Sequence, residues 1–317
     1  SWEDFLLRLS VLFYVCSLTY MASTALATDR NVATSVDLTA ALAAAAPGDR
    51  IILQAGATFV GTFTLPNKTG AGWITLQSSA VASLPAGVRV SPASAPYMPK
   101  VVAQSGNAAF IAAQGAHNYQ LVGLEITTAA NAYSYNLVAL GMGNETSLDQ
   151  LPYNLVLDRV YIHGDPAVGT KRGVTLNSKS AVIKNSYIAD IKSTSQDAQA
   201  IMGWNGPGPY QIVNNYLEAT GENIMFAGGT SAITGVIPSD IEVRHNYMFK
   251  PLSWRPGDPS YAGTNWWVKN IFELKNARRV VLDGNVMENC WANQQNGAAI
   301  LLTPRTEYLA MPWVVVE

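Results

Sequence analysis

One pattern of residues occurs in both Ile212-Val-Asn-Asn-Tyr-Leu217 and Val243-Arg-His-Asn-Tyr-Met248. An apolar residue is followed by a variable residue, a turn-type residue, a side chain that is often tyrosine and a second apolar residue. Related segments lie at 121–126, 157–162, 183–188 and 282–287. Neighbouring segments start 26 to 39 residues apart, which fits a repeat of roughly 25 residues with loop insertions.

A second short apolar segment precedes most of these repeats. These segments lie at 173–177, 200–204, 224–227, 271–275 and 299–303. Period-two alternation in such short pieces is typical of strands that bury one face. Each unit is predicted to contain a strand, a turn, a strand, a one-residue corner, a third strand and a long loop. No strand can bury its face alone, so the units must stack into an all-β solenoid.

This order of strands resembles the right-handed parallel β-helix of the pectin-lyase-like superfamily, whose second corner often carries stacked asparagines. Asn215, Asn246 and Asn285 stand at that corner here, and Ser186 substitutes for asparagine in another repeat. Stacked amides can hydrogen-bond along the axis of the solenoid. The remaining two repeats depart from the pattern, with Val160 and Leu124 at the corner.

The segment before the repeats extends the resemblance. Residues 35–46 are predicted to form a short amphipathic helix with Thr34 or Ser35 as its N-cap. The helix runs into Pro47-Gly-Asp-Arg-Ile-Ile-Leu53, which looks like the N-terminal cap and first coil of secreted β-helix polysaccharide lyases. The resemblance covers residues 34–313 and is more specific for the fold than for an activity. Another all-β solenoid or a jelly roll is the alternative.

The first 27 residues have the features of a secretory signal peptide. An apolar run at 9–20 is followed by small residues that end in Ala25-Leu26-Ala27, an A-x-A cleavage signal. The acidic residues Glu3 and Asp4 are unusual there, and a membrane anchor is the alternative. We therefore expect a secreted protein, extracellular or periplasmic, with residues 28–317 as a single β-helix domain that does not contact the membrane. Cys290 is then the only cysteine left, so no internal disulfide is expected.

The last residues, Trp313-Val-Val-Val-Glu317, resemble a strand without a polar cap. Terminal coils of a solenoid need such a cap. A truncated sequence or a second chain that completes the stack would explain this ending. Apart from that pairing, a monomer is expected.

Charged residues make up only 13% of the 317 residues, against about 25% in a typical soluble domain. The formal net charge of −2 argues against nucleic acid as a partner, and 49% hydrophobic residues exclude a disordered chain. The 25 Gly and 22 Asn residues fit a protein built from many short strands and tight turns.

A row of tyrosines follows the corner in successive repeats. The row consists of Tyr161, Tyr187, Tyr216 and Tyr247. Alternation with the apolar residue that follows points each ring outward, and aromatic faces suit stacking against sugar rings. We expect polysaccharide as the partner of this row. The alternative is a surface ladder packed under loops.

Acidic, basic and amide residues gather where the loop enters the first strand of each coil. They are Lys171, Arg172, Asp197, Gln199, Glu222, Asn223, Lys269 and Asn270. Glu273 and Lys275 alternate outward on the strand that follows the last pair. In a chain with so few charges this grouping predicts a functional cluster. The alternative is that these are ordinary solvated loop charges.

The resemblance implies roles for this cluster, since β-helix lyases carry their cleft on the outer face of this strand. Lys171 or Arg172 would remove the proton α to a uronate carboxylate, and a cation, commonly Ca²⁺, would stabilise the enolate. The implied catalytic residues are Lys171, Arg172, Glu222 and Glu273, and the implied Ca²⁺ ligands are Asp197, Glu222, Asn223 and Glu273. Lys275 would contact the substrate.

A long loop at 250–268 carries Trp254, Tyr261, Trp266 and Trp267. Loops of this length on a solenoid are usually functional, so these tryptophans are candidates for the wall of a sugar cleft. The alternative is hydrophobic packing against the flank of the solenoid.

The leading hypothesis is a polysaccharide lyase that cleaves an acidic, uronate-containing glycan by β-elimination. A non-catalytic glycan-binding, adhesion or matrix solenoid is the first alternative, supported by the absence of the motifs of β-helix polygalacturonases. A glycoside hydrolase is the second, and would need Asp197 and Glu222 at roughly 5–9.5 Å. No phosphate-binding or dinucleotide motif occurs, so no organic cofactor is expected. His163 and Asp165 are attributed to turn chemistry.

Overall fold

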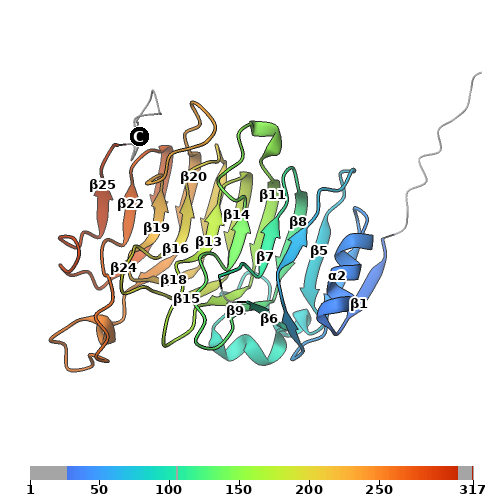
Figure 1. Ribbon diagram of the computed structural model, residues 1–317, viewed down its shortest axis with the longest axis horizontal. Helices are drawn as coiled ribbons and strands as arrows, with labels where there is room; N and C mark the ends of the chain where they lie inside the picture. Colours follow the sequence, from blue (N-terminus) through green and yellow to red (C-terminus); the bar gives the residue numbers. More distant parts are fainter. Residues whose placement is uncertain (1–26, 105, 306–315, 317) are drawn as a thin grey trace, which may run out of the picture.

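The computed structural model describes residues 27–104, 106–305 and 316. These residues form one elongated stack of coils, in which the chain advances steadily from the first strand to the last (Figure 1). The predicted signal peptide lies outside the described residues except for Ala27, and the C-terminal strand expected at 313–317 lies outside them except for Val316. No helix among the described residues is long and apolar enough to cross a bilayer.

Three sheets of parallel strands make up the walls of the stack. Sheet A contains β1 (Asp29–Val32), β2 (Arg50–Leu53), β5 (Ile74–Ser78), β8 (His117–Val122), β11 (Tyr153–Asp158), β14 (Lys179–Lys184), β17 (Tyr210–Val213), β20 (Ser239–Arg244) and β23 (Arg278–Asp283). Sheet B contains β3 (Thr58–Val60), β6 (Lys100–Ala103), β9 (Glu125–Thr128), β12 (Tyr161–His163), β15 (Tyr187–Ile191), β18 (Tyr216–Ala219), β21 (Tyr247–Phe249) and β24 (Val286–Glu288). Sheet C contains β4 (Phe63–Leu65), β7 (Phe110–Ala112), β10 (Val138–Leu140), β13 (Arg172–Leu176), β16 (Gln199–Gly203), β19 (Glu222–Phe226), β22 (Phe272–Leu274) and β25 (Ile300–Leu302). Short 3-10 helices lie at Val81–Ser83, Pro92–Tyr97, Leu148–Gln150 and Leu252–Trp254.

Each coil passes from sheet A to sheet B, then through a loop to sheet C and back to sheet A. Strands of the same sheet in successive coils pair with one another in parallel. The repeated segments found in the sequence span the end of a sheet A strand, the corner and the start of a sheet B strand, and the second set of segments forms sheet C. The predicted all-β parallel β-helix is therefore confirmed.

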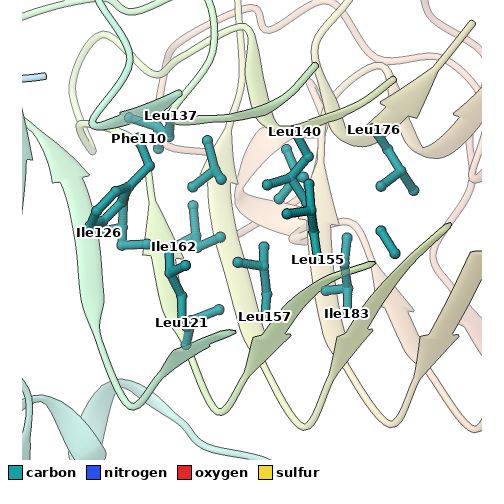
Figure 2. Close-up of a cluster of buried hydrophobic side chains, with 14 of the residues drawn as sticks. Phe110, Leu121, Ile126, Leu137, Leu140, Leu155, Leu157, Ile162, Leu176 and Ile183 are labelled. Atoms are coloured by element: carbon teal, nitrogen blue, oxygen red, sulfur yellow. The ribbon is translucent and has the colours of Figure 1, made fainter. Parts of the chain in front are cut away.

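The core is a set of apolar columns that run along the axis (Figure 2). Leu121, Leu157 and Ile183 are paired in register on sheet A, and Ile126 and Ile162 are paired on sheet B. Each side chain therefore packs on its counterpart about 4.8 Å away in the next coil. These residues are almost completely buried, which explains how the chain reaches stability with few charged residues.

The corner between sheets A and B requires a left-handed backbone conformation. The residue there has a φ between 52° and 66° in six successive coils: Gly123, Arg159, Asn185, Asn214, His245 and Gly284. Glycine and asparagine tolerate this conformation best. A Cβ at Gly284 would also lie 2.3 Å from the His245 ring. This column uses two glycines and two asparagines of the chain, and its left-handed conformation was not predicted from the sequence.

The residue after this position forms a row of amides along the axis. Asn215 Nδ2 donates to Asn246 Oδ1 at 2.9 Å, and Asn246 Nδ2 donates to Asn285 Oδ1 at 3.0 Å. The second proton of each of these two amides is bound by a backbone carbonyl of the preceding coil. Ser186 continues the row, because its N–H donates to Asn215 Oδ1. Buried polar groups at this corner are thus bonded from coil to coil.

Replacing Asn246 by alanine is expected to destabilise the protein by about 2–5 kcal/mol. The change leaves the Asn215 N–H and amide and the Ile212 carbonyl without their partner in a buried corner. Urea denaturation measures the loss, with the exposed Asn107→Ala as a matched control within about 0.5 kcal/mol of wild type. A loss below about 1 kcal/mol would show that the amide row is not a stabilising feature.

Helix α2 (Ser35–Ala44) covers the first end of the stack (Figure 1). It buries Leu38, Ala41 and Leu42 against the first coil, and the Thr34 side chain accepts the Asp37 N–H at 3.2 Å. The helix ends two residues earlier than expected. Its position closes the apolar column that would otherwise be open to water.

Asp49 holds the turn that follows this helix. Its carboxylate accepts the N–H groups of Thr28 and Ala46 and the Arg30 guanidinium at 2.9–3.0 Å. Burial raises the pKa of Asp49, but these donors outweigh burial and hold the pKa below its usual range. The charged form is therefore the form that the folded state stabilises.

This linkage predicts a pH dependence of stability. The contribution of Asp49 is complete above the ordinary aspartate pKa of about 3.9 and is lost as the pH falls through the lower pKa of the folded state. Asp49→Asn is expected to cost about 1–3 kcal/mol at neutral pH, and its difference from wild type should shrink in acid. Urea denaturation across this pH range measures both effects. A difference that stays constant down to about pH 2 would contradict the charged-form assignment.

Candidate functional site at the entry of sheet C

Charged and amide side chains from successive coils meet where the loops enter sheet C. Arg172 pairs with Gln199, and Gln199 pairs with Glu222, in the register of β13, β16 and β19. These residues therefore stack about 4.8 Å apart. The gathering expected from the sequence is thus present at this edge of the sheet.

A lysine ammonium lies at the centre of this group. Lys269 Nζ is 2.7 Å from Asp197 Oδ2 and 3.2 Å from Glu222 Oε1. Gln199 Nε2 donates to the other Glu222 oxygen at 2.9 Å. We call Lys269, Asp197, Glu222 and Gln199 the Lys269 cluster. Three successive coils contribute to it, so only the tertiary structure brings these side chains together.

Burial and ion pairing set the charges of this cluster. Burial raises the pKa of the fully buried Glu222, and the ammonium of Lys269 opposes that rise. For Lys269 itself burial lowers the pKa, but Glu222 and Asp197 outweigh it, so its pKa lies above the ordinary value. Lys269 therefore stays charged at neutral pH.

A second lysine, Lys250, supports the same edge of sheet C, and burial lowers its pKa to about 7. Lys250 is fully buried, and its Nζ donates to the carbonyl oxygens of Ala219, Thr220 and Gly221 at 2.7, 3.1 and 2.7 Å. These three residues immediately precede Glu222. Lys250 therefore fixes the turn that presents Glu222.

Arg172 and Lys171 form the basic side of the site. The Arg172 guanidinium lies 5.2 Å from the Trp204 ring centre, and burial lowers its pKa to about 10. Burial and the neighbouring Arg172 also lower the pKa of Lys171. Lys171 Nζ donates to Gln196 at 2.6 Å and lies 5.5 Å from the Tyr135 ring centre. Both bases are thus more easily deprotonated than usual.

Several residues beside this pair were missed by the sequence analysis. Gln196 Nε2 donates to the Tyr133 hydroxyl at 3.0 Å, and burial raises the pKa of Tyr133. Tyr133 and Tyr135 lie in the loop between β9 and β10, outside the repeated pattern. Only their closeness in sequence to the start of sheet C could have indicated them.

Glu273 and Lys275 lie farther along sheet C. Glu273 accepts from Asn270 Nδ2 and Thr303 Oγ1, each at 3.0 Å, and Lys275 Nζ is 3.9 Å away. On the outer face, Met202 and Met225 separate Glu273 from the coil of Arg172. Glu273 borders its own depression of about 340 Å³, lined by Asn270, Glu273, Gln295, Leu301, Thr303 and Arg305. The implied joint role of Glu273 and Arg172 at one reacting atom is not supported by this arrangement.

The residues implied as Ca²⁺ ligands do not fit a divalent ion. An ammonium already lies between Asp197 and Glu222, and Asn223 is turned away, because its Nδ2 donates to the carbonyls of Leu217 and Phe249. Within the described part of the chain no three His, Cys, Asp or Glu residues are arranged to hold a metal.

The tyrosine row lies on sheet B and not on the sheet that carries the Lys269 cluster. Tyr187 stacks on Tyr216 with ring centres 4.1 Å apart, and Tyr247 stacks on the other side of Tyr216 at 5.6 Å. Tyr161 and Tyr187 also pack against a small cluster of Leu84, Val90 and Met98. A loop thus covers part of the row, as the alternative interpretation expected.

The loop at 250–268 packs inward. Trp254 and Trp266 are buried with Val268 and Trp291 in a separate hydrophobic cluster, and Lys192 Nζ lies 4.9 Å from the Trp266 ring centre. Trp267 is half-buried. The expectation that Trp254 and Trp266 line an open cleft is not met, because the loop has to bury its own apolar side chains.

Asp165 serves a turn, as expected. Its carboxylate accepts the N–H groups of Asn131, Ala167 and Val168. His163 pairs with Glu125 at 3.0 Å and not with Asp165.

Comparison with known proteins concerns the fold. No protein-family model and no curated protein matches the sequence. An alginate lyase from Paenibacillus sp. str. FPU-7 is similar in structure, with a TM-score of 0.41 and 17% identity over 87% of this chain and 98% of the lyase. The pectate lyase Pel9A has a TM-score of 0.47 and 15% identity over 83% of this chain and 61% of that chain. The Dettilon tailspike protein has a TM-score of 0.31 and 12% identity over 84% of this chain and 64% of that chain.

The three parallel sheets define the class of this protein, a parallel β-helix. At these identities the similarity does not extend to activity.

The pairing of Glu222 with Lys269 can be measured by a double-mutant cycle. In buffer with a metal chelator, Lys269→Met is expected to cost about 3–5 kcal/mol, because it leaves a buried carboxylate unpaired. Combining it with Glu222→Gln should recover about 1–3 kcal/mol of that loss. Urea denaturation of the four proteins gives the coupling. Strictly additive losses would mean that the ion pair does not exist in solution.

Proposed function

We propose that this protein is a polysaccharide lyase that cleaves a uronate-containing glycan by β-elimination. One observation carries the proposal: Lys171 and Arg172, two adjacent bases with lowered pKa, lie beside the Tyr133, Tyr135 and Trp204 rings. The Arg172 guanidinium attracts a carboxylate, a lysine amine of lowered pKa can accept a proton, and aromatic rings suit the apolar faces of sugars.

Arg172 is assigned to the substrate carboxylate. A guanidinium binds a carboxylate with two parallel hydrogen bonds, and it remains mostly charged at neutral pH because its pKa is about 10. Its positive charge also stabilises the enolate that forms when the neighbouring carbon loses its proton.

Lys171 is assigned as the base. Its neutral amine takes the proton from C5, the carbon α to the carboxylate, and leaves the enolate that Arg172 stabilises. The electron pair of the enolate then forms a double bond between C4 and C5 as the bond from C4 to the glycosidic oxygen breaks. The Tyr133 hydroxyl gives a proton to the leaving oxygen; like any tyrosine it is protonated at neutral pH, and burial raises its pKa further. Transfer of the proton from Lys171 to the tyrosinate then restores the site.

Hydrolysis is less well supported than elimination. A hydrolase would use two carboxyl groups as acid and base or as acid and nucleophile. Asp197 and Glu222 are the pair considered for this purpose, and one ammonium binds both of them. Neither is free to exchange protons with a substrate.

Such an enzyme would act outside the cytoplasm. An N-terminal signal at 1–27 would direct the protein out of the cytoplasm, where a monomer would meet its polysaccharide. The half-buried Trp267 and the uncovered part of the tyrosine row remain candidates for binding distant parts of the chain.

An activity assay tests the proposal directly. Incubation with pectate, alginate and glycosaminoglycans should release products with a C4–C5 double bond conjugated to the carboxylate, which ultraviolet absorbance detects. Lys171→Ala and Arg172→Ala are each expected to lower kcat/KM by roughly 10²–10⁴-fold, and the surface variant Lys184→Ala serves as control. If the protein binds a glycan of this panel but cleaves none of them, the result would favour the non-catalytic glycan-binding alternative.

The pH profile distinguishes a base from a simple binding residue. Lys171 works in its deprotonated form, so kcat/KM should rise about tenfold per pH unit on the acid side of its pKa. Because that pKa is lowered, the rate should level off below pH 10.5, the ordinary value for lysine. A profile that falls with rising pH over this range would rule out Lys171 as the base.

A further inference from the structure

We propose that Lys269 is a built-in cation that takes the place of a divalent metal ion in this site. In the wild-type protein its ammonium donates a hydrogen bond to Asp197 and lies at ion-pair distance from Glu222, so that no divalent ion binds there. Removing the ammonium by substitution should convert the same residues into a divalent-cation site. This inference does not depend on the activity proposed above.

The geometry places the lysine nitrogen where a shared cation would lie. Its distances to Asp197 and Glu222 are 2.7 and 3.2 Å, and the two carboxylates belong to different coils. Two carboxylates that both contact one nitrogen atom lie close together. Without a positive charge between them they repel each other strongly. The ammonium is thus the electrostatic centre of the cluster.

The backbone fixes this ammonium in position. The Lys269 N–H donates to the Thr220 carbonyl at 2.9 Å, and the preceding Val268 is completely buried. Only 8% of the Lys269 side chain is exposed. Lys269 therefore differs from a solvated lysine that could swing away and leave the carboxylates to a metal ion.

Other charges around Glu222 are already engaged. The ammonium of Lys250 is bound by three carbonyls, and Arg172 packs on Trp204. Glu273 is held by Asn270 and Thr303. None of these groups occupies the position between Asp197 and Glu222, so the net charge there depends on Lys269.

Without its ammonium the cluster offers oxygen ligands to a hard cation. Asp197 and Glu222 each supply carboxylate oxygens, and the buried Gln199 Oε1 has no hydrogen-bond partner within the described structure. The Asp197 side chain is 36% exposed, which gives an ion access from solvent. Ca²⁺ accepts carboxylate and amide oxygens and completes its six to eight ligands with water.

The test uses purified wild-type protein and the variants Lys269→Ala and Lys269→Gln, without any glycan. Calorimetric titration with CaCl₂ and thermal unfolding in chelator or in about 10 mM CaCl₂ are the two measurements. Wild type should show no saturable binding and no calcium-dependent rise in Tm. Each variant should have a lower Tm in chelator and a saturable rise in Tm with calcium.

The matched control is the double variant Lys269→Ala/Asp197→Asn, which removes one carboxylate from the site. It should lose most of the calcium-dependent rise shown by Lys269→Ala. A rise of equal size in the double variant would place the bound ion elsewhere and overturn the proposal.

Three other results would overturn it. The first is saturable calcium binding by wild type that Asp197→Asn abolishes. The second is a Lys269 variant whose Tm does not change with calcium. The third is failure of both Lys269 variants to fold even with about 10 mM CaCl₂, since the ion should replace the ammonium. Because none of these measurements uses substrate, they leave the proposed lyase activity to be judged separately.

Discussion

The structure depends on the in-register pairing of parallel strands from one coil to the next. Because each residue lies directly above its counterpart, a single residue type repeated in sequence becomes a continuous column in space. Apolar columns form the core, and a column of left-handed residues forms the corner. The amide row from Asn215 to Asn285 satisfies buried polar groups at that corner. A domain with few charged residues can be stable for this reason alone.

The same register creates the candidate site. Arg172, Gln199 and Glu222 occupy equivalent positions in three coils, so groups distant in sequence face one edge of sheet C. Two lysines then determine the chemistry of this edge. Lys250 holds the turn before Glu222, and Lys269 neutralises its carboxylate. In the proposed function the basic pair Lys171 and Arg172 serves a substrate carboxylate, with aromatic rings beside the pair.

Much of the fold could be predicted because alternation and repeat spacing are short-range properties. The strands around 212–217 and 243–248 and those of sheet C followed from them. The directions in which single side chains point could not be predicted from alternation and repeat spacing. Asn223 belongs to the predicted cluster in sequence, yet its amide donates to the Leu217 carbonyl of its own coil and to the Phe249 carbonyl of the next coil. Trp254 and Trp266 were recognised as a loop feature, but whether such rings face a sugar or pack together depends on what lies beneath the loop.

The sequence by itself determined that the chain stacks in parallel coils and that one group of acidic, basic and amide residues lies at the entry of sheet C, because both depend only on periodicity. The tertiary structure decided which of those charges meet. Lys269 follows Glu222 by 47 residues, and only the packing of the intervening loop brings its ammonium to the two carboxylates. A periodic pattern fixes which coil a residue occupies, whereas the partner of a long side chain depends on distances between coils that no local pattern contains.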